Sequence, residues 1–443
     1  MTNDYHVRYI ILISLISAIG GYLFGFDFAV ISGALPFLKV QFGLDAYWEG
    51  FATGSLALGC MLGCLIAGNV SEKHGRKKAL LAAGCIFALS SLAMASAPSL
   101  ATFISARFVA GVGVGMASML SPMYIAEVSP AALRGRMVAL NQLTIVLGIL
   151  ITNIVNYQLS AYGDTAWRWM FGLGFVPSAL FCAGTLFIPE SPRWLLKAGK
   201  QEEAKRVLLL LSKPPIANST MASIEQNISQ ETTIDYKQAF QKPFLPALLA
   251  GIVLAIFQQF CGINVVFNYS TTIFESIGFN SSDQLLQTVF IGAVNLFFTI
   301  VALLLIDSVG RKPLMIAGAV GLAVLYLLIA HFLNIAAILS TVLLLAAIGL
   351  YATSIAPVTW VLISEIFPTK VRSEATTIAV VCLWLAYFIL TFTFPILVEW
   401  VGSVAQTFYI YAGICLLASV FIYKKIRETK GVVLEDMENM FVH

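Results

Sequence analysis

Long apolar stretches alternate with short polar connections along most of the chain. Each stretch holds about 20 mainly apolar residues, which is enough for a helix to cross a membrane. We expect helices because a backbone in lipid must satisfy its hydrogen bonds internally. The pattern predicts twelve spans, at residues 9–33, 48–70, 79–97, 100–123, 137–158, 166–188, 244–274, 284–306, 313–334, 337–363, 374–398 and 404–423.

One long polar stretch, residues 189–243, divides these spans into six and six. Its first part, 199–211, has the spacing of an amphipathic helix. Its second part, 214–241, is rich in Ser, Thr, Asn and Gln and is interpreted as a looser linker. The predicted division is therefore a six-helix domain (1–188), a linker with short helices (189–243), a second six-helix domain (244–425) and a tail (426–443).

Composition and charge indicate a membrane protein. Of the 443 residues, 59% are hydrophobic and 11% are charged, whereas soluble domains have about 25% charged residues. All but three of the 26 Lys and Arg residues lie on the side of both termini and the linker; Lys39 and Arg168 lie opposite, and Arg107 lies within a span. Cytoplasmic loops carry an excess of positive charge, so the termini and linker are predicted to be cytoplasmic and the protein to span the cell (inner) membrane.

The sequence disfavours several classes of function. The net charge of +3 follows from the topology and predicts no nucleic-acid partner. The 7 Cys fall within predicted spans and the 4 His are scattered, so we expect no disulfide, metal site or other cofactor. The first apolar run is too long for a cleavable signal peptide. Neither a nucleophile–base pair of an enzyme nor the Gly-Lys-Ser/Thr loop of an ATP-driven pump is present in the sequence.

Amide side chains interrupt the seventh predicted span. Gln258 and Gln259 precede Gly262, and Asn264 and Asn268 follow it. On an ideal helix Gln259 and Asn264 point about 140° apart, since each residue turns the chain by ~100°, but a break at Gly262 would let all four amides face one cavity. Converging amides offer donors and acceptors to a polyhydroxylated, uncharged ligand. Polar contacts between helices are the alternative interpretation.

An acidic residue, Asp27, lies in the glycine-rich first span. A carboxylate inside a membrane costs roughly 2.5–3.5 kcal/mol on insertion scales, and burial favours its neutral form. A carboxyl group that changes its charge near neutral pH is suited to carry a proton. Its predicted partner is Arg107, the cation within the fourth span. A static structural ion pair is the alternative.

Short motifs recur after corresponding spans, at offsets of 235 to 238 residues. The matching pairs are 72–77 with 307–312, Glu127 with Glu365, Pro130 with Pro368, Arg134 with Arg372, and Glu190 with Glu428. This regularity predicts an internal duplication. Parallel six-helix repeats are typical of a large transporter fold that binds its ligand between the halves, near the membrane midplane.

The repeated acids and bases predict charge clusters at the cytoplasmic ends of the helices. The residues concerned are Glu127, Arg134, Glu190 and Arg193 in the first half and Glu365, Arg372 and Glu428 in the second. Ion pairs among them that form in one conformation and break in another would bias alternating access. A solvated charged rim that only fixes topology is the alternative, although it explains the repeated Glu-to-Arg spacing poorly.

These motifs carry a family resemblance that extends from the first span to the C-terminus. Gly75-Arg76-Lys77 and Gly310-Arg311-Lys312 resemble motifs of the whole major facilitator superfamily. More specific to its sugar porter branch are Pro-Glu-Ser-Pro-Arg-Trp-Leu at 189–195, Gln-Gln-x-x-Gly-x-Asn at 258–264 and Arg-Glu-Thr-Lys-Gly at 427–431. The chain is therefore identified as a member of the sugar porters. The resemblance implies an all-α membrane protein with twelve transmembrane helices in two six-helix repeats.

The resemblance also implies roles for individual residues. The implied substrate-binding residues are Gln142, Gln258, Gln259, Asn264, Asn295, Trp360 and Trp384. Phe24, next to Asp27, is interpreted as a lid or as packing. Sugar porters that are proton symporters place Asp at position 27, whereas facilitators commonly place Asn there. Asn268 and Leu383 depart from the family pattern, which often has Tyr and usually Gln or Asn at these positions, so the identity of the sugar stays open.

We predict a secondary active transporter that imports a monosaccharide with a proton by alternating access, as a monomer in the lipid bilayer. An uncoupled sugar facilitator, an exporter of drugs or metabolites and a non-transporting sugar receptor are the alternatives. Asp27 argues against the facilitator, the amide cluster against the exporter, and the short tail after the last span against the receptor.

Overall fold

The computed structural model describes residues 4–229, 236–368 and 371–429, so the predicted tail beyond residue 429 lies outside the described residues. The described part is helical, with one isolated β-bridge between Tyr5 and Ser212. Its helices are α1 (Val7–Phe42), α2 (Ala46–His74), α3 (Arg76–Ala95), α4 (Leu100–Val128), α5 (Ala131–Leu159), η2 (Ser160–Thr165), α6 (Ala166–Gly172), α7 (Phe175–Phe187), α8 (Pro192–Lys197), α9 (Gln201–Leu211), α10 (Pro214–Ser229), α11 (Tyr236–Ala239), α12 (Leu245–Phe260), α13 (Ile263–Asn268), α14 (Ser270–Ser276), α15 (Ser281–Val309), α16 (Arg311–Phe332), α17 (Ala337–Thr353), α18 (Ile355–Glu365), α19 (Arg372–Val401) and α20 (Val404–Lys425).

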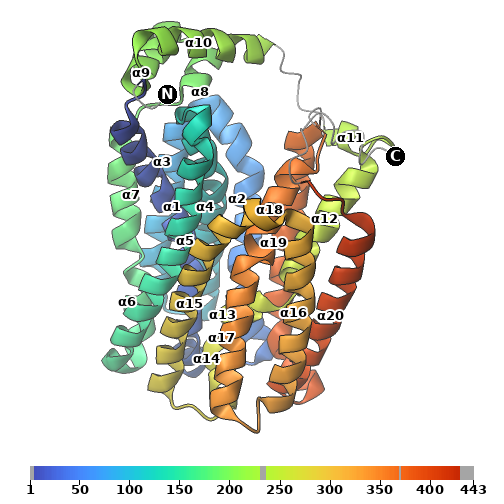
Figure 1. The fold of residues 1–443 in the computed structure, drawn as a ribbon. Coiled ribbons are helices and arrows are strands. Elements are labelled where there is room, and N and C mark those ends of the chain that lie inside the picture. The colour runs from blue at the N-terminus through green and yellow to red at the C-terminus, as the bar shows by residue number, and fades with distance from the viewer. Residues whose placement is uncertain (1–3, 230–235, 369–370, 430–443) are drawn as a thin grey trace.

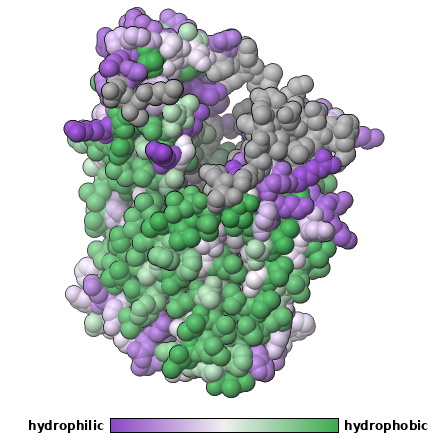
Figure 2. All heavy atoms as spheres, viewed as in Figure 1, coloured by the Kyte–Doolittle hydropathy of each residue, from purple (hydrophilic) through white to green (hydrophobic). Residues whose placement is uncertain are grey.

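The helices form two groups that stand side by side (Figure 1). We call α1–α7 the first half and α12–α20 the second half. Helices α8–α11 lie together at one end of the bundle, which we call the linker end; the opposite end is the far end. Figure 2 shows a broad apolar band across the visible face of the bundle, with hydrophilic residues toward both ends. Such a band is expected of a surface that contacts the hydrocarbon of a membrane.

The predicted set of twelve spans is confirmed. Among the described residues, eleven helical stretches are long and apolar enough to cross a membrane. One of them, 131–187, contains both α5 and the α6–α7 pair. The chain reverses its direction between them near Gly163, which has a φ of +71°. This stretch therefore supplies two crossings, and each half contains six.

The linker contains more helix than the sequence predicts. The predicted helix is confirmed as α9, but the prediction of a looser segment from residue 214 is wrong, because α10 covers Pro214–Ser229. Ala217 is buried, and Met221, Ile224 and Ile228 pack partly buried against the core. These residues are spaced by four, three and four positions, so they share one face of a helix. The many polar residues between these four positions make the helical spacing of the apolar side chains hard to recognise in the sequence.

The seventh span is broken at Gly262, as predicted. Helix α12 ends at Phe260, α13 begins at Ile263, and Gly262 between them has a φ of +84°. Only glycine adopts this left-handed conformation without steric cost. A Cβ added at Gly262 would also lie 2.5 to 2.9 Å from three atoms of the Tyr411 ring. Both the conformation and the space at this position require glycine.

Gly262→Ala is expected to destabilise the protein, because alanine would adopt a left-handed conformation that costs about 1–2 kcal/mol and would also clash with Tyr411. Thermal unfolding of the purified protein in detergent measures this effect. Gly413→Ala serves as the matched control, because no heavy atom lies within 4 Å of a Cβ added there. Equal unfolding temperatures for the two variants would contradict the proposed requirement for glycine at position 262.

Candidate functional site

The break at Gly262 brings three of the predicted amides into one hydrogen-bonded chain. Asn264 donates to Gln259 Oε1, Gln259 donates to Gln258 Oε1 over 3.4 Å, and Gln258 donates to the Ala356 carbonyl over 3.3 Å. All three side chains are at least nine-tenths buried. Each amide has four hydrogen-bonding positions, so this chain leaves positions for a ligand. We call Gln258, Gln259 and Asn264 the amide chain.

A second feature of the candidate site is an aromatic contact that joins the two halves. The ring centroids of Phe24 on α1 and Trp384 on α19 lie 5.7 Å apart at an interplanar angle of 70°. Trp384 is buried, and its Nε1 has no hydrogen-bond partner among the described residues. A buried indole N–H without a partner is suited to donate to a ligand hydroxyl, while the ring face suits apolar C–H groups.

The remaining predicted substrate residues, Gln142, Asn295 and Trp360, belong neither to the amide chain nor to the Phe24–Trp384 contact. Gln142 on α5 is half-buried and Asn295 on α15 is buried. Among the described residues neither side chain has a hydrogen-bond partner, so both amides are available to a ligand. Trp360 on α18 is 43% exposed. The structure therefore does not bring Trp360 into the buried aromatic cluster, and the binding roles of all these residues stay predictions.

Asp27 and Arg107 lie opposite each other inside the first half, as the sequence predicts. Asp27 is 0% and Arg107 1% exposed, and Arg107 Nη1 lies 3.5 Å from Asp27 Oδ1. Neither carboxylate oxygen has a hydrogen-bond partner among the described residues. The guanidinium group also faces the Phe171 ring, with its Cζ 5.7 Å from the centroid. The ion pair is thus buried but loosely joined, a geometry in which a small movement changes the interaction strongly.

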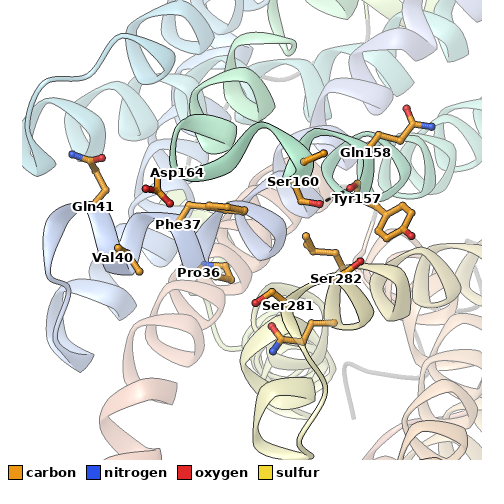
Figure 3. Close-up of a pocket in the computed structure, with 13 residues that line it drawn as sticks. Pro36, Phe37, Val40, Gln41, Tyr157, Gln158, Ser160, Asp164, Ser281 and Ser282 are labelled. Carbon is orange, nitrogen blue, oxygen red and sulfur yellow. Dashed lines mark hydrogen bonds between the residues drawn. The ribbon is translucent and has the colours of Figure 1, made fainter.

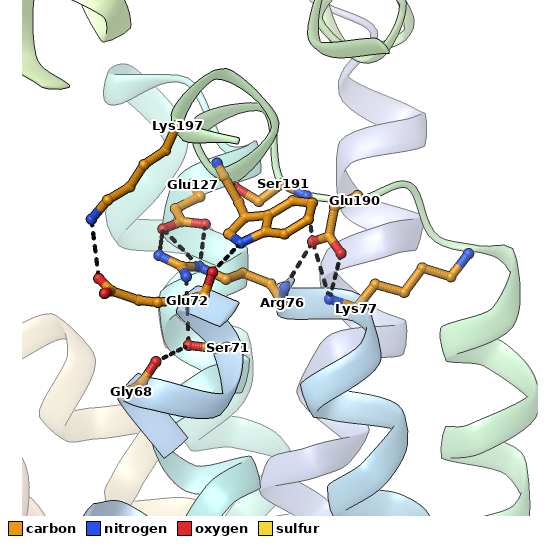
Figure 4. Close-up of polar contacts among 10 residues, drawn as sticks. Gly68, Ser71, Glu72, Arg76, Lys77, Glu127, Glu190, Ser191 and Lys197 are labelled. Carbon is orange, nitrogen blue, oxygen red and sulfur yellow. Dashed lines mark hydrogen bonds and ion pairs between the residues drawn. The ribbon is translucent and has the colours of Figure 1, made fainter. Parts of the chain in front are cut away.

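A network of charged groups forms at the linker end of the first half (Figure 4). The Glu190 carboxylate accepts hydrogen bonds from the backbone N–H of Arg76 over 2.8 Å and of Lys77 over 3.1 Å. These are the first residues of α3, where free N–H groups and the helix dipole favour an anion. The Arg76 guanidinium lies 3.1 Å from Glu127 of α4. The network therefore ties α3, α4 and the start of the linker together.

The second half repeats this arrangement at α16. Glu428 accepts hydrogen bonds from the backbone N–H of Arg311 and of Lys312, both over 3.0 Å. Arg311 pairs with Glu365 over 3.3 Å. Gly310, which precedes α16, has a φ of 106°, close to the 97° of the glycine that precedes α3. The duplication of sequence motifs is therefore a duplication of contacts.

The partners within these networks differ from those that the sequence suggests. Glu127 pairs with Arg76 and Glu365 with Arg311, although Arg76 and Arg311 were not predicted network residues. Arg134 donates to the Ala126 carbonyl and Arg372 to the Phe367 carbonyl, each over 3.1 Å. Arg193 is exposed on α8. The recurring Gly-Arg-Lys motifs were the sequence signal that could have identified the missing partners.

The two halves are joined by hydrogen bonds at the far end. Ser32 on α1 contacts Ser270 on α14 through their hydroxyl groups at 2.6 Å, and Thr271 donates to the Ser32 carbonyl over 2.8 Å. Asn153 on α5 donates to the Thr288 carbonyl on α15 over 2.7 Å. At the linker end the Arg76–Glu127 pair joins residues of the first half and the Arg311–Glu365 pair residues of the second, and Figure 2 shows the surface hollowed there between the halves. The far end is thus closed and the linker end parted.

A separate cavity of about 870 Å³ lies at the far end, between α1, α5 and α15 (Figure 3). Its lining includes Phe37, Gln41, Tyr157, Gln158 and Asp164. None of the predicted site residues lines it. This cavity is therefore distinct from the candidate site around the amide chain.

The fold and sequence are similar to those of known proteins. A model of the family described as "Sugar (and other) transporter" matches residues 13–441. The chain is 37% identical over 451 residues to the arabinose-proton symporter of Bacillus subtilis (strain 168), across 100% of this chain and 97% of that protein. It is 35% identical over 480 residues to the D-xylose-proton symporter of Escherichia coli (strain K12), across 100% and 97% of the two chains.

The solved structures agree with this similarity. The inward-open conformation of the xylose transporter XylE from E. coli is similar at a TM-score of 0.87 and 34% identity, over 98% of this chain and 100% of that one. The family match covers nearly the whole chain, and both relatives are more than 30% identical throughout. The chain therefore belongs to the sugar (and other) transporter family, the sugar porters of the major facilitator superfamily.

Proposed function

We propose that the protein imports a monosaccharide together with a proton by alternating access. The observation that carries this proposal is the buried, loosely joined Asp27–Arg107 pair. Asp27 lies three residues along α1 from Phe24, which contacts Trp384 of the second half. An ionisable pair inside a membrane protein is by default a functional site. The relatives named as arabinose-proton and D-xylose-proton symporters favour the same activity.

The cycle that we propose begins with proton binding to Asp27 from outside the cell. The sugar then binds Gln142, Asn295 and the amide chain, with Trp384 against its ring. The halves rock about this site, and renewed pairing of Asp27 with Arg107 releases the proton inward. The intact ion pair and the parted linker end support an inward-facing state for the structure.

The same proposal includes topology and assembly. The linker end carries most of the Lys and Arg residues, which supports a cytoplasmic location for it and for both termini in a cell (inner) membrane. The predicted domains at 1–188 and 244–425 would then be the rocking units. Both proposed sites are built from one chain, which supports a monomer as the transporting unit in the lipid bilayer.

Asp27→Asn is expected to abolish accumulation of sugar above equilibrium and to spare sugar exchange, because asparagine cannot carry the proton but preserves the shape of the site. Uptake of labelled D-xylose, arabinose and D-glucose into proteoliposomes, with and without an inward proton gradient, measures both properties. Asp164→Asn is the matched control, since Asp164 is exposed at the far end. Accumulation by the Asp27→Asn variant would contradict proton carriage. A wild type that only equilibrates sugar would identify a facilitator.

Gln142→Ala and Asn264→Ala are each expected to weaken sugar binding about 3- to 10-fold, because each removes a hydrogen bond that contributes about 0.5–1.5 kcal/mol. The half-saturation concentration in sugar counterflow measures this loss. Gln158→Ala removes an exposed amide from the same helix as Gln142 and should leave the half-saturation concentration unchanged. If all three variants behave alike, the proposed sugar site is wrong.

A further inference from the structure

A buried hydrogen bond joins Tyr387 of α19 to Asn268 at the end of α13. The Tyr387 hydroxyl donates to Asn268 Oδ1 over 3.0 Å, and the exposed fractions of the two residues are 2% and 0%. A buried hydroxyl or amide without a partner is costly, so each side chain depends on the other. Position 268 is also where sugar porters often have a tyrosine. In this protein the tyrosine at this point is Tyr387, which comes from α19 instead of from the seventh span.

Asn268 connects this bond to the amide chain. Its Nδ2 donates to the Asn264 carbonyl over 2.7 Å, and the Asn264 side chain donates to Gln259. Helix α13 has only six residues and lies between two interruptions of the seventh span. So short a helix makes few backbone hydrogen bonds of its own. A side-chain bond to α19 therefore contributes substantially to the position of Asn264.

The other side of Tyr387 faces the first half. Its ring centroid lies 5.7 Å from that of Phe28, and the Phe28 ring lies 5.7 Å from that of Phe267. Phe28 directly follows Asp27 on α1, so movement of this part of α1 displaces both residues together. One tyrosine thus contacts the segment that holds the amide chain and the segment that holds the buried ion pair.

We propose that Tyr387 and Asn268 are positioning residues that couple sugar binding in the second half to proton binding in the first. This inference rests on the proposed symport. A sugar held by Asn264 fixes α13, and Asn268 then fixes Tyr387 where Phe28 packs on it. The bound sugar thereby favours one position of α1, and with it one separation of Asp27 from Arg107.

The surroundings of Asp27 explain how such a movement changes proton binding. Within the described residues, the charged and titratable groups that face it are Arg107 of α4, Cys60 of α2 and Tyr387 of α19. Thiols and phenols are ordinarily neutral near neutral pH. Arg107 is therefore the charge whose distance from Asp27 decides how readily the carboxylate takes a proton.

Coupling between two sites is reciprocal, so the affinity for sugar should depend on pH. In the wild type we expect affinities at an acidic and an alkaline pH to differ at least about fivefold. Tyr387→Phe removes only the hydroxyl group and keeps the ring against Phe28. We expect this variant to bring the ratio of affinities close to one while its affinity at acidic pH stays nearly that of the wild type. Calorimetric titration of the purified protein with D-xylose or arabinose measures both affinities.

Two further variants make the test specific. Tyr326→Phe is the matched control, because Tyr326 is buried and its hydroxyl has no hydrogen-bond partner among the described residues; its ratio should equal that of the wild type. The double exchange Asn268→Tyr with Tyr387→Asn restores a phenol–amide pair with its members reversed. We expect Asn268→Tyr alone and Tyr387→Asn alone each to remove the pH dependence of the sugar affinity, and the double exchange to recover it.

The outcomes separate this inference from the proposed function. A wild type whose sugar affinity is the same at both pH values contradicts the coupling pair, whereas the symport is decided separately by proton-driven accumulation of sugar in proteoliposomes. A pH-dependent wild type with an equally pH-dependent Tyr387→Phe variant contradicts the pair alone. If both single substitutions lose the dependence and the double exchange does not recover it, the two residues are only structural and the inference is wrong.

Discussion

The cost of leaving a polar group without a partner in hydrocarbon decides where the polar side chains of these helices lie. The amides of the seventh span bond to one another, and Glu190 and Glu428 bond to the first N–H groups of α3 and α16. Such partnerships are exchangeable, because an amide that bonds to another amide bonds equally well to a hydroxyl group. Each amide of the chain also keeps hydrogen-bonding positions that its neighbours do not use, so the amide chain is both held in place and open to a further partner.

A second constraint comes from the break at Gly262. A continuous helix would point the amides in different directions, and the left-handed glycine turns them toward one region. The same break leaves α13 short and dependent on side-chain contacts, among them the Tyr387–Asn268 bond. The feature that assembles the amide chain thus also makes its position adjustable.

The extent to which the sequence predicts this structure depends on whether a feature leaves a local trace. Apolar runs of about 20 residues, a glycine among amides, and an acid or a base deep within a span are visible in a single segment. The spans, the break and the Asp27–Arg107 pairing were predicted from these features. Choice of partner is not visible in a single segment, although the recurrence of the Gly-Arg-Lys motifs marks Arg76 and Arg311 as candidates. The pairing of Glu127 with Arg76, and of Tyr387 with Asn268, depends on how distant helices pack. The helix α10 was missed because polar residues dominate its composition.

The duplicated networks at the linker end have a consequence for the energetics of switching. The Arg76–Glu127 pair lies within the first half and the Arg311–Glu365 pair within the second, so a movement of one half against the other need not break either pair. The far end is closed by hydrogen bonds such as Ser32–Ser270 and Asn153–Thr288, each of which contributes about 0.5–1.5 kcal/mol. A membrane potential of 100 mV acting on one elementary charge supplies about 2.3 kcal/mol. This energy is larger than the contribution of any single one of these hydrogen bonds, so the contacts that close the far end and the driving force on one charge are of comparable size.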